Sequence, residues 1–428
     1  MEVAAPLEPV LTGLTFPTSL AFDDDNNLYT AESGLPFAGA EPGGRVWRHE
    51  PDGTRRLLAA DMRAPVNGLT FHNGTLIVSE GGHPARIARL TLDGTLTPLL
   101  EGLPGPGNYH TNMTVVGPDG KLYFSQGAMT NSAIVGLDSY ELGWLRRLPH
   151  AHDLPGYAIE LTGVNIETAD PLADDNDRRA TTGAFVPFGT VTSTGQLIKP
   201  QLPCTAAILR CEPNGRNLEL VAWGLRNAYG LGFDAAGRLL AIDQGADDRG
   251  SRPIGNAPDL LYEVQKGRWY GWPDFIGGVP VNDPRFRPER GPAPEFVLGN
   301  HTELPAPEEA LLEFPAHAAA VKFDWAHDGR LVVALFGDER PMTAPEGPRR
   351  GRGLAIIDPA HWSIQAIITD GPARPIDVRR GADDAIYVLD FGRFEIDAER
   401  GIVAEPASGG VWRLALGQRD STSGRSGQ

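Results

Sequence analysis

The chain has 428 residues and carries 38 Lys and Arg against 55 Asp and Glu, a formal net charge of −17. This acidity argues against a nucleic-acid-binding surface, which needs clustered cations. No stretch approaches the roughly 18 consecutive apolar residues of a transmembrane helix, so we expect no membrane span. The 52 Gly and 37 Pro suit an all-β chain with many turns.

One phrase recurs along the chain: an apolar strand, a tight turn and a second apolar strand. In residues 223–245, Leu231 and Phe233 alternate with small neighbours, Gly237 closes a turn, and a second apolar run follows. Such internal repeats determine the fold more directly than any single segment. We find six copies, beginning near Pro17, Val66, Thr111, Arg226, Ala318 and Arg374.

Further strand-like runs lie between the copies, so that each unit has about four antiparallel strands. Six such units predict an all-β fold, a six-bladed β-propeller, with an array of β-sandwiches as the alternative. The C-terminal run 409–416 matches the third strand of a blade, and no fourth strand follows it. The N-terminal run 8–14 matches a fourth strand. We therefore expect these two runs to pair in the last blade and close the ring.

We expect a single domain over residues 1–418, because all blades of a ring share one core. Two segments rich in Pro, Gly and Asp, about 130–203 and 246–316, are interpreted as long insertions, which on a rigid scaffold often carry function or a contact surface. The tail 419–428 has no apolar side chain, and we expect it to be disordered.

Two cysteines, Cys204 and Cys211, stand on either side of a predicted strand. An extended strand would separate them by about 23 Å, at roughly 3.3 Å per residue. That distance is too long for a disulfide without a bend in the chain. We therefore expect two unpaired thiols.

The loops that enter the innermost strands of a propeller lie on one face of the ring. A His or Arg before a strand is usually an ordinary loop residue, but several polar residues converging on one axis indicate a site. The residues at these positions in the six copies are Thr18, Asn67, His110, Arg226, Asn227, His317 and Arg374.

The segment 223–273 resembles the glucose/sorbosone dehydrogenases, soluble quinoproteins that use pyrroloquinoline quinone (PQQ) and calcium. The resemblance runs from about residue 10 to 417 and implies oxidation of an aldose sugar or a related alcohol or aldehyde by hydride transfer to the quinone. It also implies an external electron acceptor such as a dye, a quinone or a cytochrome. The matching motifs are WGLRNAYG (223–230), DQG (243–245), APD (257–259), WYGWP (269–273), His110 before GPDGKLY (117–123), and RPID (374–377).

The resemblance assigns roles to several of these residues. His110 would be the general base that removes the hydroxyl proton, and Arg226 would stabilise negative charge developing at the quinone. Asn227 would hold the cofactor through its amide. Arg374, with Arg352 as a second candidate, would pair with PQQ carboxylates, which a guanidinium matches in shape.

Calcium would bind to oxygen ligands in the loop after the fourth copy. The resemblance implies the backbone carbonyls of Gly245 and Ala246, and the carboxylate of Asp247 in the same loop could join them. An exposed acidic turn is the alternative for Asp247. A second, structural calcium would use Asp259 and Tyr270.

At two positions the sequence departs from the soluble glucose dehydrogenases: Tyr109 stands where they have Asp before the base, and Ile376 replaces a second Arg. Two other functions therefore remain open. One is a metal-dependent lactonase-type hydrolase, which needs several Glu, Asp and Asn side chains around a central metal. The other is a non-catalytic binding propeller that has lost the cofactor.

The family resemblance implies a periplasmic or secreted protein. The opening residues MEVAAP show neither the basic nor the apolar region of a signal peptide. We expect a monomer or a homodimer.

Overall fold

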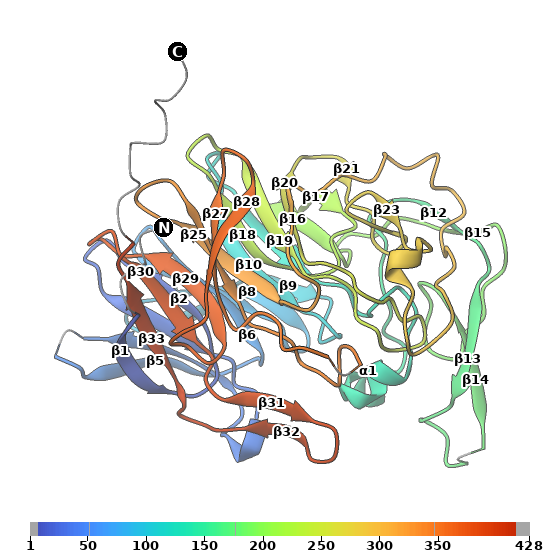
Figure 1. Cartoon of the computed structure of the whole chain (residues 1–428), viewed down its shortest axis with the longest axis horizontal. Helices are drawn as coiled ribbons and strands as arrows, with labels where there is room; N and C mark the ends of the chain where they lie inside the picture. The colour runs from blue at the N-terminus through green and yellow to red at the C-terminus, as the bar shows by residue number, and fades with distance from the viewer. Residues whose placement is uncertain (1–6, 51, 176, 346, 417–428) are drawn as a thin grey trace.

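Six β-sheets form a ring in the computed structural model, which describes residues 7–50, 52–175, 177–345 and 347–416 (Figure 1). The innermost strands contact one another in the order β2, β6, β10, β18, β25 and β29, and β29 contacts β2 again. This closed cycle confirms the predicted six-bladed β-propeller. The predicted disordered tail 419–428 lies outside the described residues.

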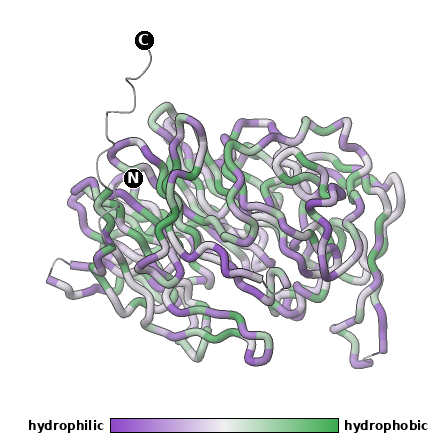
Figure 2. The backbone as a smooth tube through the Cα atoms, viewed as in Figure 1, coloured by the Kyte–Doolittle hydropathy of each residue, from purple (hydrophilic) through white to green (hydrophobic). Residues whose placement is uncertain are grey.

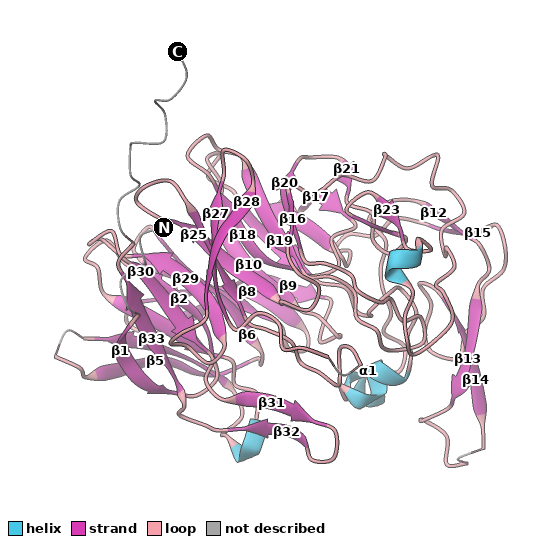
Figure 3. Ribbon diagram, in the orientation of Figure 1, coloured by secondary structure: helices cyan, strands magenta, loops and turns pink. Residues whose placement is uncertain are grey.

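Each blade is a sheet whose strands follow one another along the chain from the innermost strand outward, except for the outermost strands of the third and sixth blades (Figure 3). From the innermost strand outward, the first blade is β2 (Pro17–Phe22), β3 (Leu28–Glu32), β4 (Gly44–His49) and β5 (Arg55–Met62), and the second is β6 (Val66–His72), β7 (Thr75–Glu80), β8 (Ala85–Thr91) and β9 (Leu96–Leu103). The third is β10 (Thr111–Val116), β11 (Leu122–Gln126), β16 (Ala207–Cys211), β17 (Glu219–Trp223) and β21 (Arg268–Trp269), and the fourth is β18 (Ala228–Phe233), β19 (Leu239–Asp243), β20 (Leu260–Val264) and β24 (Leu312–Glu313). The fifth is β25 (Ala320–Trp325), β26 (Leu331–Leu335), β27 (Gly353–Asp358) and β28 (Ser363–Ile368), and the sixth is β29 (Pro375–Arg380), β30 (Ile386–Asp390), β33 (Gly409–Leu414) and β1 (Glu8–Leu14).

Short hairpins and helices lie between these strands. They are η1 (Phe37–Gly39), α1 (Leu137–Glu141), α2 (Trp144–Arg147), β12 (Ile159–Leu161), β13 (Asn165–Ala169), β14 (Arg179–Gly183), β15 (Gln196–Ile198), β22 (Phe275–Ile276), β23 (Val279–Pro280), η2 (Pro284–Phe286), β31 (Phe394–Asp397) and β32 (Gly401–Ala404). None of the helices in the described residues is long and apolar enough to cross a membrane.

The two ends of the described chain meet in the sixth blade. Strand β1 pairs antiparallel with β33, from Glu8 opposite Arg413 to Leu14 opposite Gly409. The N-terminal strand thus supplies the outer strand that the C-terminal part lacks, as predicted, and covers what would otherwise be an exposed sheet edge.

The two long insertions enter the ring in different ways. Residues 130–203 lie between the second and third strands of the third blade. The segment 246–316, interpreted above as a second insertion, contains β20 and β24 of the fourth blade and the parallel strand β21 added to the third. Strands β21 and β24 have only two residues each, too few for an alternating apolar pattern to reveal them.

The last residue of the second strand caps the loop in front of the innermost strand in most blades. Asp243 accepts hydrogen bonds from the backbone N–H groups of Arg226 and Asn227, at 3.1 and 2.6 Å. Asp390, at the same position of the sixth blade, accepts from Ala373 and Arg374 at 2.9 and 2.8 Å. These carboxylates fix the loops that reach the ring axis, since an unpaired buried N–H is costly.

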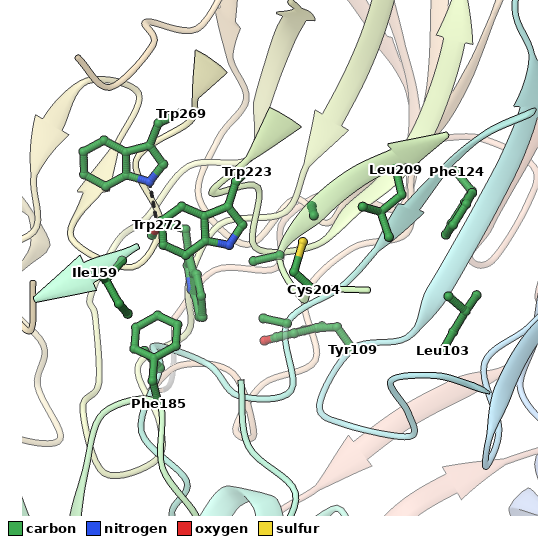
Figure 4. Packing of buried hydrophobic residues seen from close by; sticks show 14 of the residues in the cluster. Leu103, Tyr109, Phe124, Ile159, Phe185, Cys204, Leu209, Trp223, Trp269 and Trp272 are labelled. Atoms are coloured by element: carbon green, nitrogen blue, oxygen red, sulfur yellow. Dashed lines mark hydrogen bonds between the residues drawn. The ribbon is translucent and has the colours of Figure 1, made fainter. Parts of the chain in front are cut away.

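The largest hydrophobic cluster joins the third blade to its insertion and to the second blade. Trp223 and Trp269 stack with ring centroids 6.4 Å apart, and the Trp269 Nε1 donates to the carbonyl of Trp272 (Figure 4). Hydrophobic residues run along the blade strands, whereas the projecting β13–β14 hairpin is hydrophilic at its tip (Figure 2). Cys204 and Cys211 are buried and unpaired, as predicted.

A buried lysine occupies the centre of the ring. Lys322, on β25, has no exposed surface, and its ammonium donates to the carbonyls of Thr18 and Asn67, both at 2.7 Å. The carboxylate of Asp377, on β29, lies 3.5 Å away and also accepts from the hydroxyl of Ser19. One side chain therefore joins the innermost strands of the first, second, fifth and sixth blades.

We predict that Lys322→Met lowers the free energy of unfolding by about 3 kcal/mol, because it leaves the two carbonyls without a donor and removes one of the two cations beside Asp377, the other being Arg379 at 2.9 Å. Urea denaturation would measure the change. The control is Lys199→Met at an exposed position, which should change stability by less than about 0.5 kcal/mol. Equal stability of the two variants would contradict the role given to Lys322.

Candidate active site

A cavity of about 720 Å³ opens where the loops of all six blades converge. We call it the axial cavity. Its walls include the loops before β6, β10, β18 and β25, the loop between β3 and β4, helices α1 and α2, and hairpin β31–β32. The predicted site residues that line it are His110, Arg226, Asn227, Gly245, Asp247, Asp259 and His317.

Arg226 is held in the wall of the axial cavity with 3% of its surface exposed. Its guanidinium donates to the carbonyls of Gln244 and Gly245 and to the Asp247 carboxylate, the last at 2.7 Å. It also donates to the carbonyl and side-chain oxygens of Asn131. Burial lowers the pKa of Arg226 to about 10, so the side chain remains a cation at neutral pH.

Tyr109 lies against this cation. Its ring faces the Arg226 guanidinium at 4.2 Å, and its hydroxyl accepts hydrogen bonds from Arg226 and Arg249. The same hydroxyl donates to Asp247 Oδ2 at 3.1 Å. Tyr109 thus takes part in the site, although the sequence showed it only as a departure from a family pattern.

His110 precedes β10 and lines the axial cavity. Its Nδ1 is buried and has no hydrogen-bond partner among the described residues. Gly81 makes room for this side chain, because a Cβ at position 81 would lie 2.6 Å from the His110 Cβ. Burial lowers the pKa of His110 to about 4, so the imidazole is neutral at neutral pH and can accept a proton.

The amide of Asn227 is fixed on both sides. Its Nδ2 donates to Gln244 Oε1 at 2.6 Å, and its Oδ1 accepts from Asn112 Nδ2 at 2.8 Å. This arrangement holds the amide at the cavity wall, with 4% of the residue exposed.

The residues predicted to bind calcium fall into two groups. Gly245 and Asp247 line the axial cavity, where both accept from Arg226. Asp259 also lines it, but its two oxygens accept from the N–H groups of Gly245 and Ala320, at 2.9 and 2.8 Å. This carboxylate thereby links the fourth and fifth blades, and burial raises its pKa to about 7.

The other two predicted calcium ligands, Ala246 and Tyr270, lie outside the axial cavity. Ala246 is buried in the core of the fourth blade, and the Tyr270 hydroxyl donates to the carbonyl of Glu263 at 2.7 Å. Within the described residues, no group of three or more His, Cys, Asp or Glu could hold a metal ion.

Arg374 and Arg352 do not line the axial cavity; they lie behind its wall and are paired with protein acceptors there. Arg374 is 1% exposed, and its guanidinium donates to the carbonyls of Gly337, Asp338 and Phe394. Both arginines donate to Glu395, Arg352 through two bonds of 2.6 and 2.7 Å. A cofactor carboxylate would have to displace these protein acceptors.

Thr18 and Asn67 do not line the axial cavity, for a reason of register. They follow the first residues of their strands, Pro17 and Val66, whereas His110 and Asn227 precede theirs. A shift along a strand redirects each side chain. Thr18 instead donates to the carbonyl of Val66, and Asn67 to that of Thr111.

The insertions contribute site residues that sequence reasoning missed. Asn131, from the first insertion, accepts from Arg226, and Arg249, from the loop after β19, contacts Tyr109 and Asp247. Neither position has a counterpart in the repeated phrase. The only signal for Arg249 was its place directly after Asp247 and Asp248.

No protein-family model matches the sequence, and no curated protein sequence matches it. Solved structures similar to this chain include a glucose dehydrogenase-type oxidoreductase from Thermus thermophilus (20% identity, TM-score 0.56, 96% of this chain and 99% of that one). Others are the PQQ-bound aldose sugar dehydrogenase of Streptomyces coelicolor (15%, 0.57, 97% and 98%) and the holo PQQ domain of pyranose dehydrogenase from Coprinopsis cinerea (15%, 0.56, 96% and 96%). At these identities the similarity is one of fold.

Proposed function

We propose that the axial cavity is the active site of a PQQ- and calcium-dependent dehydrogenase that oxidises the hydroxyl group of an aldose sugar or related alcohol. The observation that carries the proposal is a neutral imidazole, His110, in the same cavity as the buried cation Arg226. Oxidation of an alcohol removes a proton from the hydroxyl oxygen and a hydride from the carbon that bears it; a base would take the proton, and a fixed positive charge would stabilise the negative charge that the hydride brings to the quinone. The sequence motifs around Arg226 and the shared fold support the same reaction.

The side chains around the axial cavity fit PQQ when a divalent cation accompanies it. PQQ has three carboxyl groups, and the cavity wall holds three guanidinium groups and five carboxyl groups, so the guanidinium groups alone would not balance the charge of the cofactor. The groups concerned are Arg147, Arg226 and Arg249 against Glu141, Asp247, Asp259, Asp338 and Glu339.

Calcium would supply the missing positive charge. The carbonyl oxygens of Gln244 and Gly245 and the carboxylate of Asp247 are ligands of the kind that Ca²⁺ prefers. Each of them accepts a hydrogen bond from Arg226. Calcium would therefore share these oxygen acceptors with Arg226. Asn227 would hold the cofactor through its fixed amide.

The bound quinone would supply the hydride acceptor, and the protein would position the substrate and move its proton. His110 Nδ1 is buried, so Nε2 is the nitrogen that would accept the hydroxyl proton. Arg226 would stabilise negative charge in the site without moving, since Asp247, Asn131 and Tyr109 already hold it in place. Electrons would leave to an external acceptor.

We predict that His110→Ala lowers kcat about 10²–10⁴-fold, the usual contribution of a general base, and leaves PQQ binding intact. Dye reduction and PQQ fluorescence titration would measure the two effects. His361→Ala, at an exposed position, is the control and should keep full activity. Full activity of His110→Ala would exclude the assigned base, and hydrolysis of a lactone without PQQ would favour the lactonase alternative.

The pH profile gives a second test. If His110 is the base, kcat/KM should fall near pH 4, because the low pKa of His110 keeps it neutral until then. Asp259 titrates near pH 7 in the same cavity wall, so a limb near pH 7 belongs to Asp259 and the limb near pH 4 to His110. A limb near pH 4 that persists in the residual activity of His110→Ala would contradict the assignment.

The stability of the folded protein must be followed over the same pH range. Burial also lowers the pKa of His49 to about 4. Because the unfolded chain takes up these protons at about pH 6.5 and the folded chain only near 4, the two histidines destabilise the fold as the pH drops between these values. Asp243 and Asp259, whose pKa values burial raises to about 7, stabilise the fold as the pH drops over the same range. Circular dichroism at each pH separates a change in folding from a change in catalysis.

A further inference from the structure

The wall of the axial cavity changes in chemistry between its buried and its exposed parts. The polar residues Arg226 and Asn227 are buried. Among the described lining residues, the exposed ones are Pro36, Pro42, Glu141, Leu142, Arg147 and Ile402. Four of these six are apolar, and the two charged ones have opposite signs. The part of the cavity next to solvent is therefore largely apolar.

Half-buried apolar side chains continue this surface. They are Phe37, in η1, and Ile396, in β31, and both line the axial cavity. Helix η1 contacts β32, and Figure 1 shows β31, β32 and α1 along one edge of the molecule. We call Pro36, Phe37, Leu142, Ile396 and Ile402 the apolar mouth. Large apolar side chains that stay exposed together beside a cavity are typical of a binding surface.

The apolar mouth is held in place by the protein itself. Side chains alternate along β31, so that Phe394 and Ile396 line the axial cavity while Glu395 between them does not. Glu395 accepts two hydrogen bonds from Arg352, at 2.6 and 2.7 Å, and anchors the hairpin. The ring of Phe394 packs against that of Phe37, with centroids 5.2 Å apart. The mouth therefore has a defined shape before any ligand binds.

The position of the apolar mouth indicates what it contacts. In the proposed function, buried Arg226 and Asn227 would hold the cofactor, which leaves the exposed residues to the substrate. A compound whose hydroxyl reaches His110 would have the rest of its body beside Ile396 and Ile402. A bare sugar would lose hydration of its hydroxyl groups against these side chains, whereas an alkyl chain would gain from burial.

We propose that the substrate is an alcohol with an apolar chain, bound with its hydroxyl group at His110 and its chain against the apolar mouth. This inference rests on the proposed function and names the substrate class within it. The hydroxyl proton would go to His110 and a hydride would leave the carbon that bears the hydroxyl for the quinone. The alcohol R–CH₂OH would thus become the aldehyde R–CHO.

Two measurements on the full chain test the substrate class. Isothermal titration calorimetry of the cofactor-free protein compares 1-butanol, 1-hexanol and 1-octanol. We expect the affinity to rise about tenfold for each added pair of CH₂ groups, as burial of both would give. Dye-linked oxidation with PQQ and Ca²⁺ compares the same alcohols with glucose, and kcat/KM for 1-octanol should exceed that for glucose by about tenfold or more.

A matched pair of variants locates the effect on β32. Ile402 is 47% exposed and lines the axial cavity, whereas the next residue, Val403, is 36% exposed and does not line it. Ile402→Asp should weaken binding of 1-octanol about tenfold and change that of 1-butanol least, because the longer chain buries more apolar surface. Val403→Asp introduces the same charge one residue away and should leave all three affinities unchanged.

The outcomes separate this inference from the proposed function. A rise of affinity with chain length that Ile402→Asp removes supports the apolar mouth, even if no alcohol is oxidised and the proposed function fails. Equal affinity for the three alcohols, equal effects of the two Asp variants, or a higher kcat/KM for glucose than for 1-octanol would overturn the inference and leave the proposed function standing. An effect of Ile402→Asp on the KM of the dye alone would also overturn it, by assigning the mouth to the electron acceptor.

Discussion

The buried ammonium of Lys322 is the interaction on which the ring depends. Innermost strands of a propeller present polar backbone groups to a shared axis, where water is scarce and each unpaired group is costly. Lys322 satisfies carbonyls of the first two blades and, together with Arg379, balances the charge of Asp377 in the sixth. Asp377 in turn accepts from the N–H of Leu20 and the hydroxyl of Ser19. One cation thus offsets the polar cost of closing the ring and fixes the relative positions of strands that are far apart in sequence.

The candidate site repeats this principle on the face of the ring. The caps at Asp243 and Asp259 fix the loops around Arg226, whose charge is then shared among Asp247, Asn131 and Tyr109. A site fixed in this way can provide a cation and a base without rearrangement, which is the form of electrostatic stabilisation that enzymes use most. With the proposed function, the excess of carboxyl groups around the axial cavity would make the binding of an anionic cofactor depend on a second cation.

Much of the fold could be predicted because the repeat is carried by local chemistry. The alternation of apolar residues and the turn glycines gave the six blades, and the unmatched runs at the two ends gave the closure between β1 and β33. His110, Arg226 and Asn227 came from the same phase of the repeat and do line one cavity. Arg374 stands at the same position of the repeat, but its guanidinium donates to Glu395 of hairpin β31–β32. The repeated sequence pattern does not predict this hairpin. The sequence could not reveal the roles of Lys322, Arg249 and Asn131. These roles depend on contacts between segments 95 to 304 residues apart, or on insertions that have no counterpart in the repeat.

The central claim is that the axial cavity binds PQQ together with a divalent cation. Titration of the purified full chain with PQQ, followed by calorimetry in the presence of CaCl₂ and again in EDTA, tests it most directly. The account predicts saturable binding with calcium and binding weaker by about 100-fold or more without it, since two positive charges are then missing from a low-dielectric site. Equal affinity in EDTA, or no binding with calcium, would contradict it.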